Sequence, residues 1–292
     1  FFEQPTGMLT SSSCTVRLSG SLSKAVGYFC RTASLIFLSR AHFTSSQAQT
    51  AQCSAGKDSA GPSVKLRNFG TSARKMNYKS YQSLIGLQRP HVVGDGFYVT
   101  PVFGEFAFSN DISPFLMFDY GAPKRFEPTS RKLGVGMHPH RGFETVTVAF
   151  QGEVEHGDSV GNRGVIKAGD VQWMSAARGI VHEEFHSREF AAAGGMLEMA
   201  QLWVNLPAKF KMSPPRYQAI TRDQIPEVPL EGGGSVRVIS GSFGGAEGPA
   251  KTYTPVLVWV IELPEAGREQ DLTLGEGFNA LVFVRRGAVR AC

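Results

Sequence analysis

Short hydrophobic runs separated by glycines and prolines dominate the chain from Ser80 onward, and these runs are rich in Val, Phe and Tyr. Segments of this length and composition, bounded by turn residues, are typical of β-strands. We find no pattern of a long amphipathic helix, although residues 222–227 could form a short capped turn. A series of short strands with turns between them predicts an all-β sandwich or barrel. The expected strands are residues 97–103, 114–119, 145–150, 164–166, 170–174 and 197–204.

One part of this pattern occurs twice. Residues 143–154 and 278–289 each contain Phe, an apolar run, Gly and Val at the same spacing, 135 residues apart. A repeat of this length indicates a duplicated domain, so a second barrel is expected to begin between residues 236 and 260. The chain ends at Cys292, before the repeat would complete a second barrel, and we therefore expect that barrel to be truncated.

The positive charge of the chain is concentrated in its first part. The net charge is +5, but residues 1–76 contain nine Lys or Arg and two acids, a balance of +7, and the remainder sums to −2. The folded part is therefore expected to be nearly neutral, which removes the argument for direct nucleic-acid binding. No apolar run approaches the roughly 20 residues that a membrane-spanning helix needs.

These first 76 residues also differ in composition from the rest. They are rich in Ser, Thr, Ala and Arg and poor in acids, as in a mitochondrial or plastid transit peptide. A disordered tail or an incorrect gene model is the alternative. We expect this leader to lack fixed structure and to direct the protein to an organelle; without targeting, the cytoplasm or nucleus is expected. The cysteines lie outside the predicted first barrel, which excludes a thiol ligand or nucleophile there: they are Cys14, Cys30, Cys53 and Cys292.

The candidate chemistry begins with His138, His140 and Glu144. Side chains on a strand alternate between its two faces, so both histidines point the same way, and Glu144 joins them if the strand continues. A carboxylate in that place could act as a base beside a metal, orient a histidine, or itself bind the metal.

A second pair, His182 and Glu184, obeys the same rule, and Glu183 between them faces the opposite side. Two such pairs meeting inside a barrel would offer three imidazoles and one carboxylate. This set leaves open positions on a six-coordinate metal, which indicates a catalytic or sensing site; the ligand types favour iron(II), with Mn, Ni, Cu or Zn as alternatives. Two other histidines are expected to have lesser roles: His156 at a pocket edge or on an exposed turn, and His186 at the surface.

Three motifs together resemble the pirin family of bicupins, over roughly residues 78–292. They are His138-Pro-His-Arg-Gly-Phe-Glu-Thr-Val, Gly169-Asp-Val-Gln-Trp-Met and Arg178-Gly-Ile-Val-His-x-Glu. The resemblance implies two jelly-roll cupin barrels and places the metal ligands at His138, His140, His182 and Glu184, with Glu144 as the catalytic base. The repeat offset maps the first-motif positions onto Thr273, Gly275 and Asn279, and no histidine follows His186, so the second barrel is expected to lack a site.

The expected domains are a leader at 1–76, a metal-binding cupin at 77–220 and a degenerate, incomplete cupin at 221–292. The resemblance implies a quercetin 2,3-dioxygenase-like oxidoreductase that acts on a small aromatic chelating substrate of the flavonol type. The alternative is a metal- or redox-dependent regulator, without enzymatic activity, that binds a transcription factor or a metabolic enzyme. We expect a monomer that binds neither membranes nor nucleic acid.

Overall fold

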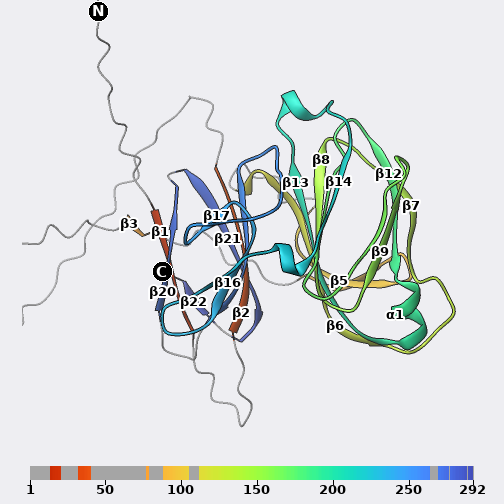
Figure 1. Ribbon diagram of the computed structural model, residues 1–292, viewed down its shortest axis with the longest axis horizontal. Helices are drawn as coiled ribbons and strands as arrows, with labels where there is room; N and C mark the ends of the chain where they lie inside the picture. Colours follow the sequence, from red (N-terminus) through yellow and green to blue (C-terminus); the bar gives the residue numbers. More distant parts are fainter. Residues whose placement is uncertain are drawn as a thin grey trace, which may run out of the picture.

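The computed structural model describes residues 14–20, 32–40, 77–78, 88–104, 112–263, 269–275, 277–287 and 289–291. These residues form two β-barrels that lie side by side, and almost all regular structure in them is strand (Figure 1). The expected all-β, bicupin fold is therefore confirmed. No helix in these ranges is long and apolar enough to cross a membrane.

The first barrel is made of a seven-stranded and a four-stranded sheet. The predicted strands are present with bounds that agree within two residues, except that the strand expected at 114–119 continues to Phe126, because short runs of β-branched and aromatic residues between turn residues favour strands. The larger sheet, in the order β14-β11-β8-β13-β6-β5-β4, contains β4 (His91–Val93), β5 (Phe97–Phe103), β6 (Phe115–Phe126), β8 (Phe143–Gln151), β11 (Val171–Ser175), β13 (Gly195–Asn205) and β14 (Arg216–Ile220). The smaller sheet, in the order β10-β9-β12-β7, contains β7 (Gly134–His140), β9 (Val154–Asp158), β10 (Arg163–Ile166) and β12 (Ile180–His186).

Short helical turns connect some of these strands. The helix α1 (Arg188–Ala193) was not predicted; it begins after Ser187, whose side chain accepts a hydrogen bond from the Phe190 backbone N–H. The predicted capped turn is present as η3 (Arg222–Gln224), with a capping box between Thr221 and Gln224. A further turn, η2 (Ala208–Phe210), follows β13.

The second barrel is built on a five-stranded sheet in the order β15-β16-β19-β2-β21 and a smaller sheet in which β1 pairs with β20, β22 and β3. A separate pair is formed by β17 and β18. The strands are β1 (Cys14–Gly20), β2 (Thr32–Arg40), β3 (Asn77–Tyr78), β15 (Glu227–Pro229), β16 (Ser235–Ser240), β17 (Ser242–Phe243), β18 (Ala246–Glu247), β19 (Val256–Leu263), β20 (Glu269–Leu274), β21 (Phe278–Arg286) and β22 (Val289–Ala291).

Two of these strands, β1 and β2, correct the sequence prediction, which placed both segments in a leader without fixed structure. The physical reason is the pairing of sheet edges: β2 lies between β19 and β21 and satisfies the backbone groups of both. The rest of residues 1–76 lies outside the described ranges, so its role as a transit peptide stays a prediction.

The sequence repeat is visible as a structural repeat. Strands β8 and β21 are both nine residues long, and each is followed by a glycine at positive φ, Gly152 at 80° and Gly287 at 79°. Glycine adopts this conformation without steric cost. A Cβ at Gly152 would lie 2.8 Å from Cδ1 of Leu197, so the turn requires glycine for space as well.

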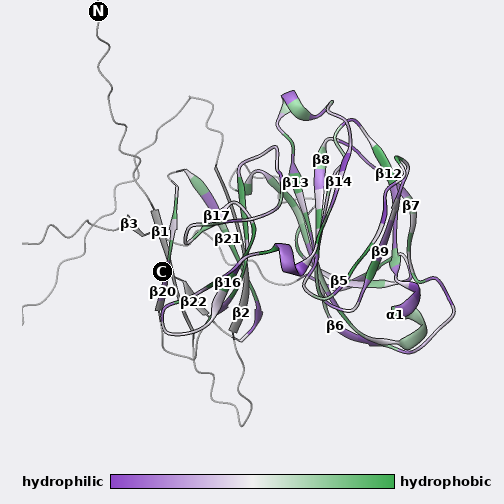
Figure 2. Cartoon of the chain, in the orientation of Figure 1, coloured by the Kyte–Doolittle hydropathy of each residue, from purple (hydrophilic) through white to green (hydrophobic). Residues whose placement is uncertain are grey.

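The larger sheet of the first barrel has two buried faces. Val146 and Val148 of β8 belong to the same core cluster as Val256 and Val258 of the second barrel. Ala149, on the opposite face of β8, belongs to the core inside the first barrel. The strands between the barrels are accordingly hydrophobic over much of their length (Figure 2). On β8, even-numbered residues therefore face the second barrel and odd-numbered residues face the interior.

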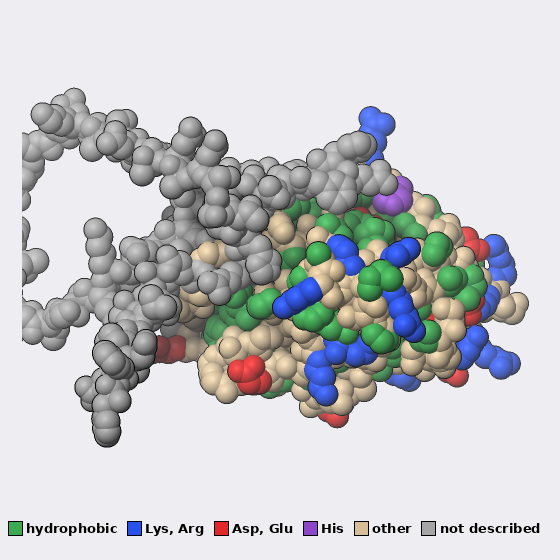
Figure 3. Space-filling view, turned by 90° about the horizontal axis from the view of Figure 1, so that it is seen from above, with side chains coloured by type: hydrophobic (Ala, Val, Ile, Leu, Met, Phe, Trp, Pro, Cys, Tyr) green, Lys and Arg blue, Asp and Glu red, His purple; other side chains and the backbone are tan. Residues whose placement is uncertain are grey.

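The described surface is of mixed type on the face seen from above, where lysine and arginine side chains lie among hydrophobic ones (Figure 3). Lys124 Nζ is 4.0 Å from the centre of the Tyr98 ring, and Lys132 Nζ is 3.6 Å from that of Phe185. The aliphatic part of a lysine side chain in such a position covers apolar surface, while the charged ammonium group remains in contact with water.

A buried carboxylate of the first barrel forms ion pairs with two arginines of the second barrel. Glu198 of β13 is fully buried and forms ion pairs of 2.8 Å with both Arg285 and Arg286 of β21. Tyr120 and Gln151 each donate a hydrogen bond of 2.7 Å to the same carboxylate. Burial opposes ionisation of Glu198, but these hydrogen bonds and the Arg285 charge lower its pKa, so the group is charged at neutral pH.

Replacement of this carboxylate should destabilise the protein. Glu198→Ala leaves the guanidinium of Arg285, whose side chain is only 11% exposed, without its counter-charge, and loss of one partner of a buried pair costs about 3–5 kcal/mol. The matched control is Arg286→Ala, because that side chain is 45% exposed and such a pair contributes about 1 kcal/mol or less. Urea denaturation would measure both; equal losses of unfolding free energy would contradict this account.

Candidate metal centre

Three histidines converge on the interior face of the smaller sheet. Strands β7 and β12 pair antiparallel with His138 opposite His182, and His140 lies two residues further along β7 on the same face. One ring nitrogen from each lies within 4.8 Å of those of the other two. The ring centres are 4.2 Å apart for His138 and His182 and 4.8 Å apart for the other two pairs. The structure thus brings together the histidines of the two sequence motifs.

The protonation states of these rings suit a metal ion. His138 Nδ1 lies 2.8 Å from the Gly136 carbonyl oxygen, to which it can donate a hydrogen bond. The other ring nitrogen, Nε2, then has a free lone pair. Burial and the neighbouring His138 lower the pKa of His140 to about 4. Burial, followed by the charges of His138, His140 and His156, lowers the pKa of His182 to about 2. Both rings are therefore neutral at pH 7.

One buried nitrogen atom of this cluster needs a hydrogen-bond or metal partner. His182 Nε2 is buried and has no hydrogen-bond partner among the described residues. A buried polar atom in that state is destabilising, and a bound ion would satisfy it. Neutral imidazoles with converging lone pairs are also the donor set that divalent transition metals prefer. The residues present therefore fit a metal ion.

The fourth expected ligand, Glu184, lies beside this cluster. Its carboxylate groups with His182 and His156, within the same 4.8 Å limit, and His182 belongs to both groups. Gln172 Nε2 donates to Glu184 Oε1 at 2.8 Å, and Thr147 Oγ1 donates to the same oxygen at 3.4 Å. Burial raises the pKa of Glu184, and these two donors oppose the rise. Glu184 therefore has a fixed orientation next to His182, a candidate metal ligand.

The intervening residue, Glu183, faces the opposite side of β12, as its position in the strand predicts. On the outer surface its Oε1 forms ion pairs with Lys132 Nζ at 3.3 Å and with Arg163 Nη1 at 3.7 Å. The expected alternation of inward-facing and outward-facing side chains along β12 is therefore present.

The predicted base, Glu144, is not brought to this cluster. It is an even-numbered residue of β8 and lies directly across from Ser175 of β11, on the face that packs against the second barrel. Its carboxylate accepts a hydrogen bond from the Ser175 hydroxyl, and burial raises its pKa. The prediction failed because β7 ends at His140 and Gly142, at φ 81°, turns the chain before β8 begins. Alternation cannot be counted across that turn.

Two further histidines are buried: His156, expected at a pocket edge or on an exposed turn, and His186, expected at the surface. His156 of β9 has no exposed surface; its Nε2 lies 3.1 Å from Asp158 Oδ2, and its Nδ1 lies 3.4 Å from Nδ1 of His182. His186 is 3% exposed and lies against the Phe126 ring, with Nε2 2.9 Å from the Gly96 carbonyl oxygen. A signal for His156 was available in the sequence, because Asp158 two residues later shares its face of a strand.

A cavity of about 380 Å³ opens next to the histidine cluster. This is within the volume range of ligand pockets, about 300–1,000 Å³. His140 belongs both to this wall and to the candidate metal-binding group, whereas Pro139 and Val181 lie opposite each other on the outward-facing side of β7 and β12. The wall is formed by Pro139, His140, Arg141, Ser159, Gly179, Ile180 and Val181.

Comparisons with known proteins agree with this arrangement. The family described as Pirin matches residues 96–204. The chain is 50% identical, over 72% of its length and 74% of the relative, to "Putative quercetin 2,3-dioxygenase PA2418" of Pseudomonas aeruginosa. It is 38% identical to "Pirin-like protein" of Solanum lycopersicum, over 69% of this chain and 64% of that protein. The crystal structure of quercetin 2,3-dioxygenase from Acinetobacter baumannii superposes with a TM-score of 0.59 at 42% identity, over 69% of this chain and 84% of that one.

The geometry predicts which substitutions remove the metal. His182→Ala deletes the ligand that both metal-binding groups share, and we expect metal affinity to fall by more than about 100-fold, beyond the loss seen for residues that only support ligands. The matched control is Glu183→Ala, which changes the adjacent outward-facing carboxylate and should bind metal as the unaltered protein does. Metal content after equilibrium dialysis measures both. An equal loss in the two variants would show that the assumed faces of β12 are wrong.

Proposed function

The chain belongs to the pirin family, and from this premise we propose that it is a non-haem iron dioxygenase acting on a flavonol-type substrate. The observation that carries the proposal is the convergence of His138, His140 and His182 on the interior face of the smaller sheet, beside a cavity of about 380 Å³ that His140 also lines. The names of the relatives in Pseudomonas and Acinetobacter point to the same reaction.

In this proposal the three imidazoles hold the ion, and Glu184 is the fourth ligand. The depressed pKa values of His140 and His182 keep these rings available as neutral donors at physiological pH. When bound, iron(II) would supply open coordination positions at which a chelating substrate and dioxygen react. Manganese, nickel, copper and zinc accept the same ligand types and remain alternatives for the cofactor.

The cavity wall would orient the substrate. Val181 gives an exposed apolar side chain against which an aromatic ring can pack, and Arg141 belongs to the same wall. A fixed positive charge favours the substrate oxygen in its anionic form. Because Glu144 lies on the other face of β8, this proposal assigns it no part in the reaction.

One observation favours a second candidate, a regulator that binds a protein according to its metal state. Hydrophobic side chains are exposed on the smaller sheet and its turns: Met137 of β7 is 58% exposed, and Val160, in the turn after β9, is 56% exposed. Met137 directly precedes the ligand His138, so occupancy of the site could alter this surface. Exposed apolar residues in a group are common at interaction sites.

Oxygen consumption tests the enzymatic proposal. Protein loaded anaerobically with iron(II) should consume oxygen when quercetin is added, and His140→Ala should abolish this uptake because it removes a ligand. Uptake would be followed with an oxygen electrode, with bound iron determined on the same samples. Bound iron without any quercetin-dependent uptake would reject the dioxygenase and favour the regulator.

The placement of Glu144 gives an independent expectation. Glu144→Gln keeps the size of the side chain and should retain uptake within a few fold, because the group lies away from the metal. A general base typically contributes about 10²–10⁴-fold to the rate. A loss of that size, with iron content unchanged, would restore Glu144 as the base and contradict the geometry.

A further inference from the structure

We propose that Asp158 and His156 form a hydrogen-bonded relay that fixes the orientation and tautomer of His182, so that its Nε2 lone pair faces the metal. The inference rests on the proposed metal site but not on the choice of substrate. It assigns positioning roles to two residues that lie outside the predicted ligand set.

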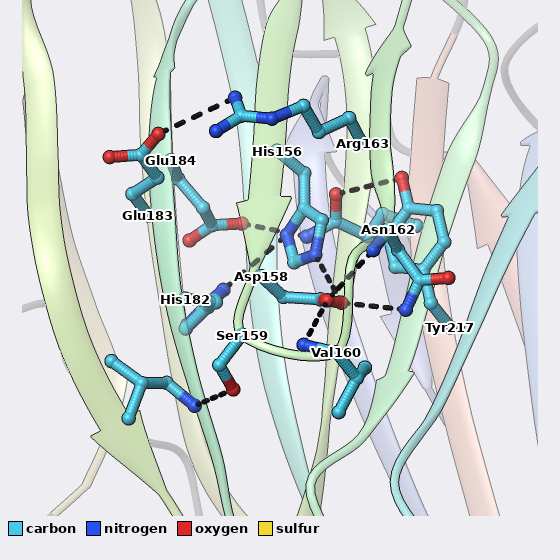
Figure 4. Close-up of polar contacts among 12 residues, drawn as sticks. His156, Asp158, Ser159, Val160, Asn162, Arg163, His182, Glu183, Glu184 and Tyr217 are labelled. Atoms are coloured by element: carbon cyan, nitrogen blue, oxygen red, sulfur yellow. Dashed lines mark hydrogen bonds and ion pairs between the residues drawn. The ribbon is translucent and has the colours of Figure 1, made fainter.

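The relay is a continuous line of buried polar atoms. Asp158 Oδ2 is 3.1 Å from His156 Nε2, and His156 Nδ1 is 3.4 Å from His182 Nδ1 (Figure 4). The side chains of Asp158 and His156 are both fully buried. At the far end, His182 Nε2 has no partner in the described part of the chain.

The pairing of the strands explains why these groups meet. Strand β9 lies beside β12, with Asp158 opposite His182 and His156 opposite Glu184. Side chains opposite each other on paired strands lie on the same face and within contact distance. The ring of His156 is further fixed by Tyr217, on which it stacks with centres 4.5 Å apart and planes inclined by 16°.

The carboxylate of Asp158 is held in one orientation. Its Oδ1 accepts the backbone N–H groups of Val160 at 3.0 Å and Asn162 at 2.9 Å, and its Oδ2 accepts the Asn162 side-chain amide at 2.8 Å. Three donors from the turn after β9 thus direct one oxygen at His156. This oxygen can only accept a hydrogen bond.

The positions of the protons follow from this fixed end. Because Asp158 accepts, His156 Nε2 must carry a hydrogen, and a neutral His156 then presents a lone pair at Nδ1. His182 can satisfy that lone pair only by donating from its own Nδ1. The remaining nitrogen of His182, Nε2, is thereby left with a free lone pair, and it is a buried atom without a partner among the described residues.

The other possible placements of hydrogen on His156 are unfavourable, either for its contact with Asp158 or for His182. If His156 carried its hydrogen on Nδ1 alone, a nitrogen lone pair would face the Asp158 carboxylate at 3.1 Å. A doubly protonated His156 would force a hydrogen onto His182 Nε2, where no acceptor is present. In either case His182 could not donate its Nε2 lone pair to a metal.

A parallel set of contacts orients Glu184. The Tyr217 hydroxyl donates to Gln172 Oε1 at 3.3 Å, and Gln172 Nε2 donates to Glu184 Oε1 at 2.8 Å. Tyr217 therefore contributes to both sets, through its ring to His156 and through its hydroxyl to Gln172. One set ends on His182 and the other on Glu184, both of which are inward-facing residues of β12.

A pair of substitutions of equal shape at His156 tests the relay. His156→Leu removes the acceptor for His182 Nδ1–H, and we expect iron(II) affinity to fall about 10–100-fold, the usual loss when the partner of a metal-bound histidine is removed. His156→Asn has the same branching but places an amide oxygen near the former Nδ1 position, and it should recover most of that loss. Anaerobic chelator competition measures both affinities. Equal binding by the Leu variant and the unaltered protein would overturn the proposal.

A spectroscopic readout separates the relay from a role in packing. In zinc-loaded protein labelled with ¹⁵N-histidine, His182 should coordinate through Nε2 and carry its hydrogen on Nδ1. In Asp158→Asn, which keeps the side-chain shape but removes the charge, the His182 Nδ1 resonance should shift while the backbone spectrum stays folded. Coordination through His182 Nδ1, or an unchanged resonance in both the Asp158 and His156 variants, would reject the relay.

These results are distinguishable from a failure of the proposed function. Normal iron affinity with the expected loss in His156→Leu, but without quercetin-dependent oxygen uptake, would leave the relay intact and reject the dioxygenase. Failure of the unaltered protein to bind any metal would reject both.

Discussion

Antiparallel pairing of β7 with β12 is the constraint on which the rest of the site depends. The two histidine motifs are far apart in the sequence, and only this pairing places His138 opposite His182. The alternation of side chains along each strand then brings His140 and Glu184 to the interior and sends Glu183 to the exterior. A shift of one residue in either strand would reverse these faces and remove the site entirely.

Burial gives the cluster its chemical character, and hydrogen bonds give it a defined geometry. Desolvation keeps His140 and His182 neutral, which a metal ligand requires. A buried ring without partners could rotate or exchange tautomers, and the contacts from Asp158 through His156 prevent this for His182. The larger sheet supports the same barrel from the other side, where its second face packs against the second barrel and Glu198 binds Arg285.

Much of the fold and of the grouping of the candidate histidines was predictable from the sequence, because both depend on local periodicity. The strand spacing, the repeat of β8 in β21 and the inward direction of His138, His140 and His182 all follow from alternation within single strands. The errors arose where the structure depends on turns or on distant pairing. Gly142 reverses the chain and sends Glu144 to the other face of its sheet, and His156 is buried only because β9 pairs with β12. No local pattern in the leader indicates that β2 pairs with β19 and β21.

The position of the metal tests the account most directly. Crystals of the iron-loaded protein, measured at the iron absorption edge, would locate the ion in an anomalous difference map. We predict a peak about 2.0–2.2 Å from the Nε2 atoms of His138 and His182 and from one nitrogen of His140. A peak on the other side of the His182 ring, bound to Nδ1 and shared with His156, would contradict both the assigned ligands and the relay.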